Sequence, residues 1–65
     1  MNNAGLKFGD AIKLSDRKRP VIVERVEDSC FFSNGIEYST MRGGDELVRM
    51  SGSVPQIVKF RVVSL

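Results

Sequence analysis

The chain has 65 residues, with ten Lys or Arg, eight Asp or Glu, one Cys and neither His nor Trp. A chain of this length forms one domain, here residues 1–65, and buries only about 60% of the surface that it exposes when unfolded. The net charge of +2 is too small to recruit an acidic partner, so any such recruitment needs a local cluster of Lys and Arg. One Cys excludes an internal disulfide, and without His a Cys/His metal site lacks its ligands.

The N-terminal residues have neither the charged region nor the apolar region of a secretion signal, and no apolar run is long enough to span a bilayer. We therefore expect a cytoplasmic protein with no membrane partner. Residues 1–5 are short and polar and are expected to be flexible.

The first predicted strand covers residues 11–14, in which Ile12 and Leu14 face inward. Residues 15–20 follow as a loop, because Ser and Asp favour turns and Pro has no amide donor. Residues 21–27 are the strongest predicted strand by content of β-branched side chains.

The buried face of residues 21–27 stays open at this point. A two-residue turn at positions 28 and 29 would place Ile22 and Val26 in the core, but it would also turn Glu24 inward. A longer loop would shift the register by one residue and bury the other set, Val21 and Val23.

Residues 30–41 predict a β-hairpin whose turn is Asn34-Gly35, since both residues tolerate the positive φ of a type I′ turn. Counting outward from the turn, the expected cross-strand pairs are Ser33 with Ile36, Phe32 with Glu37 and Phe31 with Tyr38. One side of this hairpin, with Phe31, Ile36 and Tyr38, should be core.

Two further elements complete the chain. Residues 46–50 predict a short strand, with a single helical turn as the alternative. Residues 57–65 predict a last strand with a basic outer face, in which Val58, Phe60 and Val62 alternate with Lys59 and Arg61.

Short strands separated by turns, with no amphipathic helix, predict an all-β domain. A small barrel is favoured because a closed sheet has no exposed edges. The length fits an SH3-like barrel of about five antiparallel strands.

The segments 9–14, 20–23, 30–32 and 46–48 resemble the YodC-like small bacterial proteins of uncharacterised function, which are predicted SH3-like barrels. The resemblance covers about two thirds of the chain and implies a fold rather than an activity. This chain departs from the family at Phe32, where a Trp is usual, and at Lys18 and Arg19, where two Gly residues are usual.

Arg17, Lys18 and Arg19 form a charge cluster in the loop before Pro20, where they could contact phosphates without being buried. Lys13, Lys59 and Arg61 on the adjacent strand faces are their expected companions. The alternative is a solvated loop. These six residues predict nonspecific binding of nucleic acid, because no recognition helix is expected to enter a groove.

Phe32 is predicted on the outward face of the hairpin, where it could stack on a base or fill a pocket of a partner. The alternative is that it packs against Arg25, which the tight turn would place directly opposite. Phe32 and Arg25 are thus the candidate residues of a second function, a protein-interaction module. This module could form a homodimer through the exposed hairpin face or the edge of the C-terminal strand.

We predict no catalytic residues, no metal site and no cofactor. The carboxylates are scattered, and neither a Ser nor the Cys has a candidate base beside it in the sequence. The sequence therefore predicts a small non-enzymatic accessory or regulatory protein of bacterial or phage type, with nucleic acid or a host protein as its partner.

Overall fold

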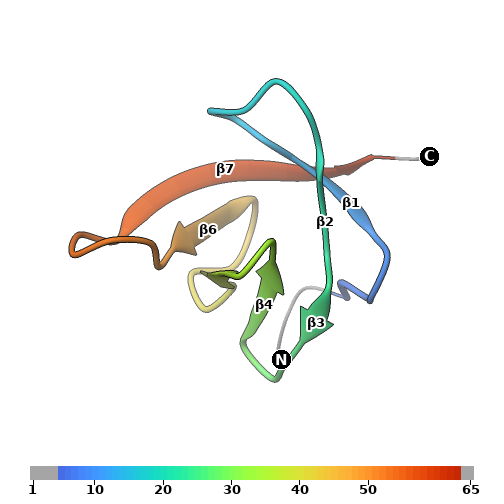
Figure 1. The fold of residues 1–65 in the computed structure, drawn as a ribbon, viewed down its shortest axis with the longest axis horizontal. Coiled ribbons are helices and arrows are strands. Elements are labelled where there is room, and N and C mark those ends of the chain that lie inside the picture. The colour runs from blue at the N-terminus through green and yellow to red at the C-terminus, as the bar shows by residue number, and fades with distance from the viewer. Residues whose placement is uncertain (1–4, 64–65) are drawn as a thin grey trace.

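The computed structural model describes residues 5–63, which form strands and turns and no helix that could cross a membrane (Figure 1). The strands are β1 (Ala11–Leu14), β2 (Val21–Ile22), β3 (Arg25–Val26), β4 (Cys30–Ser33), β5 (Ile36–Ser39), β6 (Glu46–Arg49) and β7 (Gln56–Val63). Except for Gly5, the segment predicted to be flexible lies outside the described residues, as do the last two residues of the predicted final strand.

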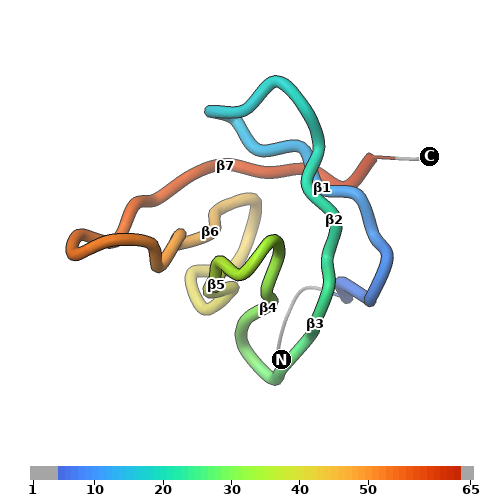
Figure 2. The backbone as a smooth tube through the Cα atoms, in the orientation of Figure 1, coloured from blue at the N-terminus to red at the C-terminus, as the bar shows by residue number. Residues whose placement is uncertain are grey.

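All neighbouring strands pair antiparallel in the order β2-β1-β7-β6-β5-β4-β3. The sheet curls into a half-barrel (Figure 2). Its two outermost strands, β2 and β3, are consecutive in the chain and are separated by Val23 and Glu24 alone. The prediction of an all-β fold is confirmed. The described residues form seven strands rather than about five, chiefly because residues 21–27 divide into two.

The division occurs because the chain changes its pairing partner between Val23 and Glu24. The Val23 N–H donates to the Asp10 carbonyl at 2.9 Å, and the Val23 carbonyl accepts from the Gly9 N–H at 2.8 Å, so Val23 still pairs beside β1. The next amide, that of Glu24, donates to the Phe32 carbonyl at 2.8 Å, beside β4. These two residues are therefore a corner of the sheet.

Because of this corner, each of the two alternatives left open by the sequence describes one part of residues 21–27. The tight-turn register is confirmed, because Val26 pairs with Phe31 and packs against the core. Before the corner, however, Val23 is fully buried and Ile22 is 42% exposed. The tight-turn register would have placed Ile22 in the core, but the corner shifts the inward-facing positions by one residue, so that Val23 is buried there instead.

The central hairpin forms with the predicted register, including the pairs Phe31 with Tyr38 and Phe32 with Glu37. Its turn has φ of 54° at Asn34 and 78° at Gly35, the positive values of a type I′ turn. The rings of Phe31 and Tyr38 stack across the two strands, with centroids 5.0 Å apart. Local turn chemistry therefore fixes the aromatic centre of the core.

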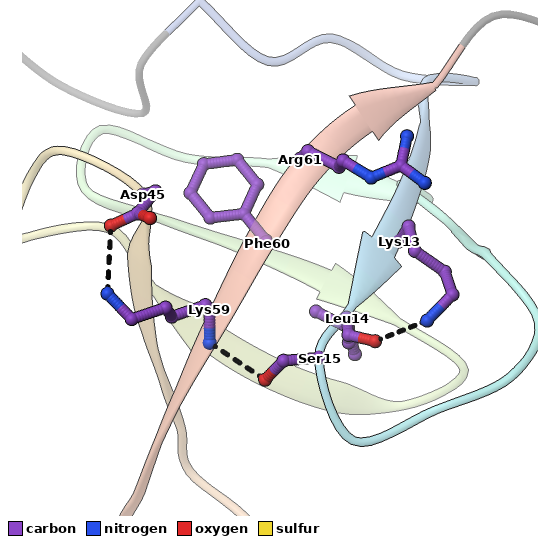
Figure 3. A pocket seen from close by; sticks show the side chains of 7 residues that line it. All are labelled: Lys13, Leu14, Ser15, Asp45, Lys59, Phe60 and Arg61. Atoms are coloured by element: carbon purple, nitrogen blue, oxygen red, sulfur yellow. Dashed lines mark hydrogen bonds and ion pairs between the residues drawn. The ribbon is translucent and has the colours of Figure 1, made fainter.

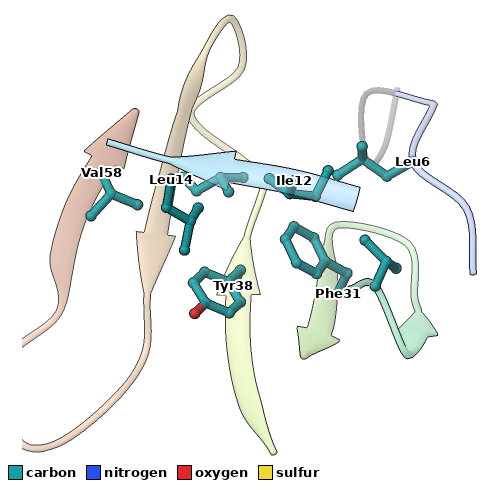
Figure 4. Packing of buried hydrophobic residues seen from close by; sticks show 8 residues of the cluster. Leu6, Ile12, Leu14, Phe31, Tyr38 and Val58 are labelled. Atoms are coloured by element: carbon teal, nitrogen blue, oxygen red, sulfur yellow. The ribbon is translucent and has the colours of Figure 1, made fainter. Parts of the chain in front are cut away.

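The core lies on the concave side of the sheet and draws on nearly every strand (Figure 4). Its buried members are Leu6, Ile12, Leu14, Val23, Phe31, Tyr38, Leu47 and Val58. Phe60 packs against this cluster and remains half-buried. The predicted inward position Val62 is 54% exposed, because β7 has run past the end of β6 at that point.

The C-terminal strand is not one of the two outermost strands of the sheet. β7 lies between β1 and β6, with residues 60–63 paired to β1 and residues 56–59 paired to β6. Each half of β7 thus pairs with a strand on one side only, and the predicted dimer contact along this strand stays a prediction. Residues 46–49, for which a helical turn was the alternative, form the strand β6.

Candidate nucleic-acid interface

The pairing of β1 with β7 places Lys13 directly opposite Arg61 (Figure 3). Like charges opposite each other on adjacent strands destabilise a sheet. Neither side chain forms an ion pair within residues 5–63. The Lys13 ammonium instead donates to the carbonyl of Leu14 at 2.9 Å and to that of Arg17. These bonds give Lys13 a structural role at the start of the following loop, whereas no ion pair within residues 5–63 accounts for the charge of Arg61.

A shallow pocket of about 470 Å³ lies beside the two cations, where β7 passes from β6 to β1. It is lined by Lys13, Leu14, Ser15, Asp45, Lys59, Phe60 and Arg61. The structure thus brings together three of the six predicted nucleic-acid contacts.

Backbone hydrogen bonds fix both walls of this pocket against β7. The Ser15 N–H donates to the Lys59 carbonyl at 2.8 Å, and the Lys59 N–H donates to the Ser15 hydroxyl at 3.2 Å. On the other wall, the Phe60 N–H donates to the Asp45 carbonyl at 2.9 Å. The pocket is therefore bordered by chain segments that are held in place.

Lys59 differs from the other cations of the pocket because two carboxylates lie near it. Its ammonium is 3.6 Å from Asp45 and 3.8 Å from Glu46. Both separations are long, and the Lys59 and Asp45 side chains are 64% and 63% exposed, so water screens these contacts. One end of the pocket therefore holds Asp45 with Lys59 beside it, and the other end holds the cations Lys13 and Arg61.

The predicted basic loop leaves β1 directly after the pocket, and Arg17, Lys18 and Arg19 are all exposed on it. Asp16 anchors the start of this loop. Its two carboxylate oxygens each accept a hydrogen bond of 2.8 Å from Arg49 of β6. The loop is therefore a solvated segment with a fixed base.

Arg49 is the buried partner in this ion pair, with its side chain 5% exposed. Its guanidinium lies 5.7 Å from the centre of the Tyr38 ring and also donates to Gln56 at 3.2 Å. The hydrogen bond from Arg49 lowers the pKa of Asp16, and the same bond raises the pKa of Arg49. Both groups are therefore charged throughout the neutral range, which keeps the loop attached to the barrel.

Within residues 5–63, most of the six predicted cations form no ion pair, whereas most of the other Lys and Arg side chains do. Outside this set, Arg25, Arg42 and Arg49 are each bonded to a carboxylate, of Glu27, Glu46 and Asp16 respectively. Of the predicted six, Lys59 alone forms an ion pair within residues 5–63. Most of the unneutralised positive charge thus lies on β1, the following loop and the C-terminal half of β7.

The structure places Phe32 and Arg25 on β4 and β3, and neither lines the pocket. The Arg25 guanidinium lies 4.9 Å from the centre of the half-buried Phe32 ring and also bonds Glu27. The ring therefore packs under Arg25, as the alternative expected.

No described residues suggest a metal site, because no three of the His, Cys, Asp and Glu side chains in residues 5–63 converge. Cys30 is half-buried, and burial together with Glu37 and Glu27 raises the pKa of its thiol. The thiolate, which is the reactive form, is therefore disfavoured at neutral pH.

Comparison of the chain with protein-family models, curated proteins and solved structures finds no match. The resemblance to the YodC-like proteins stays a prediction. The side chains of the site itself are therefore the basis for assigning a function.

Sequence reasoning missed Ser15, Asp45 and Phe60 as pocket residues, and Asp16 and Arg49 as the anchor of the loop. Asp16 and Arg49 are 33 positions apart, and Ser15 and Lys59 are 44 apart. Their proximity depends on the pairing of the first and last strands, whose register no local turn sets. A clue was available at Arg49, a cation in a predicted short strand between apolar neighbours.

Proposed function

We propose that this chain is a small, non-enzymatic, cytoplasmic accessory protein of bacterial or phage type, with an SH3-like half-barrel, that binds nucleic acid nonspecifically. Its contacts are to the phosphate backbone, made by Arg17, Lys18, Arg19, Lys13, Lys59 and Arg61. Binding of this kind derives its affinity from cations that replace the condensed counterions of the strand.

The observation that carries this proposal is the facing pair Lys13 and Arg61 on β1 and β7. Two cations held opposite each other without a carboxylate between them destabilise the sheet, and a phosphate between them would remove the repulsion. The hydrogen bond from Lys13 to the carbonyl of Arg17 joins this pair to the basic loop. A phosphate backbone could therefore follow one surface from the pocket to the loop.

Nonspecific contact is favoured because residues 5–63 contain no helix to enter a major groove. The cations also lie on an open, shallow surface. Such a surface suits a flexible single strand better than the deep grooves of a duplex.

The test is a fluorescence-anisotropy titration of a labelled single strand against three proteins. The double variant Lys13→Gln/Arg61→Gln should bind about 10- to 30-fold more weakly than wild type at low salt, if each contact contributes about 1 kcal/mol. The matched control, Lys7→Gln/Arg25→Gln, removes the same charge from cations that do not line the pocket. Equal losses in the two variants would mean that net charge, not this site, determines binding.

A second candidate is a protein-interaction module, and exposed apolar side chains on the outer face of β6 and β7 favour it. Val48 pairs with Ile57, which is 55% exposed, and Met50 just beyond β6 is 46% exposed. Phe32 and Arg25 lie on the same curved sheet. An apolar interface of this kind, with a host protein or a second copy, should respond little to salt, whereas phosphate binding should weaken steeply.

A further inference from the structure

The charged groups at the two ends of the pocket beside β7 are complementary to the two ends of a nucleotide. In Figure 3, Asp45 lies on one side of the Phe60 ring, and Lys13 and Arg61 lie on the other. A nucleotide likewise carries hydrogen-bond donors on the edge of its base and a negative charge on its phosphate. The two ends of the pocket thus complement the two ends of one nucleotide unit.

Between these ends the apolar surface of the pocket is formed by Phe60, since Leu14, which also lines the pocket, has a fully buried side chain. Phe60 packs against the core on one side and is half-buried, so its ring is held in place. A held aromatic ring is a stacking platform for any base, and stacking tolerates a change of sequence. The volume of about 470 Å³ lies in the range of pockets that hold small molecules.

We propose that this pocket takes one base of a single-stranded nucleic acid, stacked on Phe60, and that Asp45 makes guanine the preferred base. This inference rests on the proposed function, since the neighbouring phosphates are held by Lys13 and Arg61. It adds a base preference at one position to binding that is otherwise nonspecific.

Guanine is preferred because of the donors on its Watson–Crick edge. Its N1–H and its N2 amino group point the same way and match the two oxygens of a carboxylate. Adenine and cytosine offer one amino group beside a ring nitrogen acceptor, which would face the second oxygen. Uracil and thymine offer one N–H between two carbonyls. Discrimination by a bidentate contact is large enough to measure.

The Asp45 carboxylate is available for this contact. The ion pair that involves it spans 3.6 Å to the Lys59 ammonium, and the Asp45 side chain is 63% exposed. A base can therefore approach its oxygens without breaking a short hydrogen bond.

The experiment uses four labelled thymidine strands of equal length that differ at one central position, which is G, A, C or T. Wild type should bind the G strand about fivefold or more tightly than the others. The variant Asp45→Asn should bind all four strands and lose the preference for G. The control Asp28→Asn removes an exposed carboxylate from the turn between β3 and β4, and it should keep the preference.

The outcomes separate this inference from the proposed function. Equal binding of all four strands by wild type, or a G preference that persists in Asp45→Asn, would overturn the base pocket while leaving phosphate binding intact. Absence of binding to every strand at low salt would overturn both.

Discussion

The ion pair between Asp16 and Arg49 should be the most sensitive polar contact in the fold. We predict that Asp16→Ala lowers the free energy of unfolding by about 2 kcal/mol. Removing one partner of a fully buried ion pair costs about 3–5 kcal/mol, because the remaining charge stays buried and unpaired. Arg49 meets that condition with its side chain 5% exposed, but Asp16 is 45% exposed, so water can replace part of the lost bonding.

For a domain of this size, 2 kcal/mol corresponds to a fall in Tm of about 8–16 °C. Urea titration should report the change, followed by circular dichroism and by the fluorescence of the single Tyr, which is buried beside Arg49. The matched variant Asp45→Ala removes a carboxylate whose cation is 3.6 Å away and exposed, and it should change stability by less than about 0.5 kcal/mol.

A second variant distinguishes the destabilisation caused by the unpaired buried charge from that caused by the loss of the contact itself. In Asp16→Ala/Arg49→Met no buried charge is left behind, so part of the lost stability should return. If Asp16→Ala alone matched wild type within about 0.5 kcal/mol, the reasoning on the buried guanidinium would be refuted.

The pKa of Asp16 is lowered by its bond to Arg49, so the stability from this pair is present above the ordinary value of 3.8 and is lost as pH falls through the folded pKa. The stability difference between wild type and Asp16→Ala should therefore hold from about pH 7 to pH 5 and shrink in stronger acid; a constant difference in acid would contradict this. Gly35→Ala should cost about 1 kcal/mol in urea titrations, because φ is 78° and nothing lies within 4 Å of the new methyl group, so backbone strain is the whole effect. Asn34→Gly should cost much less. Burial raises the pKa of the Cys30 thiol, so it should react with a disulfide reagent at about pH 8 more slowly than glutathione does, and an equal rate would refute the assignment.

Local chemistry made part of the fold predictable. The Asn34-Gly35 turn sets the register of the central hairpin, and the short connection at residues 28–29 sets the pairing of Val26 with Phe31. In both places the signal lies within a few residues of the structure that it determines.

The rest of the fold depends on contacts between distant segments. At Val23 and Glu24 the backbone changes from pairing beside β1 to pairing beside β4. Nothing in the sequence of residues 21–27 marks this change of partner. The exposure of Val62 likewise depends on where β6 ends. The alternation of apolar and polar residues predicts neither effect, because it assumes that a strand has the same neighbours along its whole length.

The candidate site shows the same division. The cations of the loop were predictable from the run at residues 17–19, and Lys13, Lys59 and Arg61 from strand alternation. That Lys13 faces Arg61 follows from the register between the first and last strands, which only the folded chain reveals. The position of Asp45 at the pocket could not be predicted for the same reason.

The salt dependence of single-strand binding tests the central claim most directly. If Lys13, Lys59, Arg61 and the three loop cations each contact a phosphate, the logarithm of the affinity should fall with that of the salt concentration with a slope of about −4.2. Between about 50 and 200 mM salt this is a loss of roughly 300-fold, and Lys13→Gln/Arg61→Gln should reduce the slope by about 1.4. Affinity that does not change with salt, or a slope that is the same in the variant, would contradict a phosphate-binding role for this face.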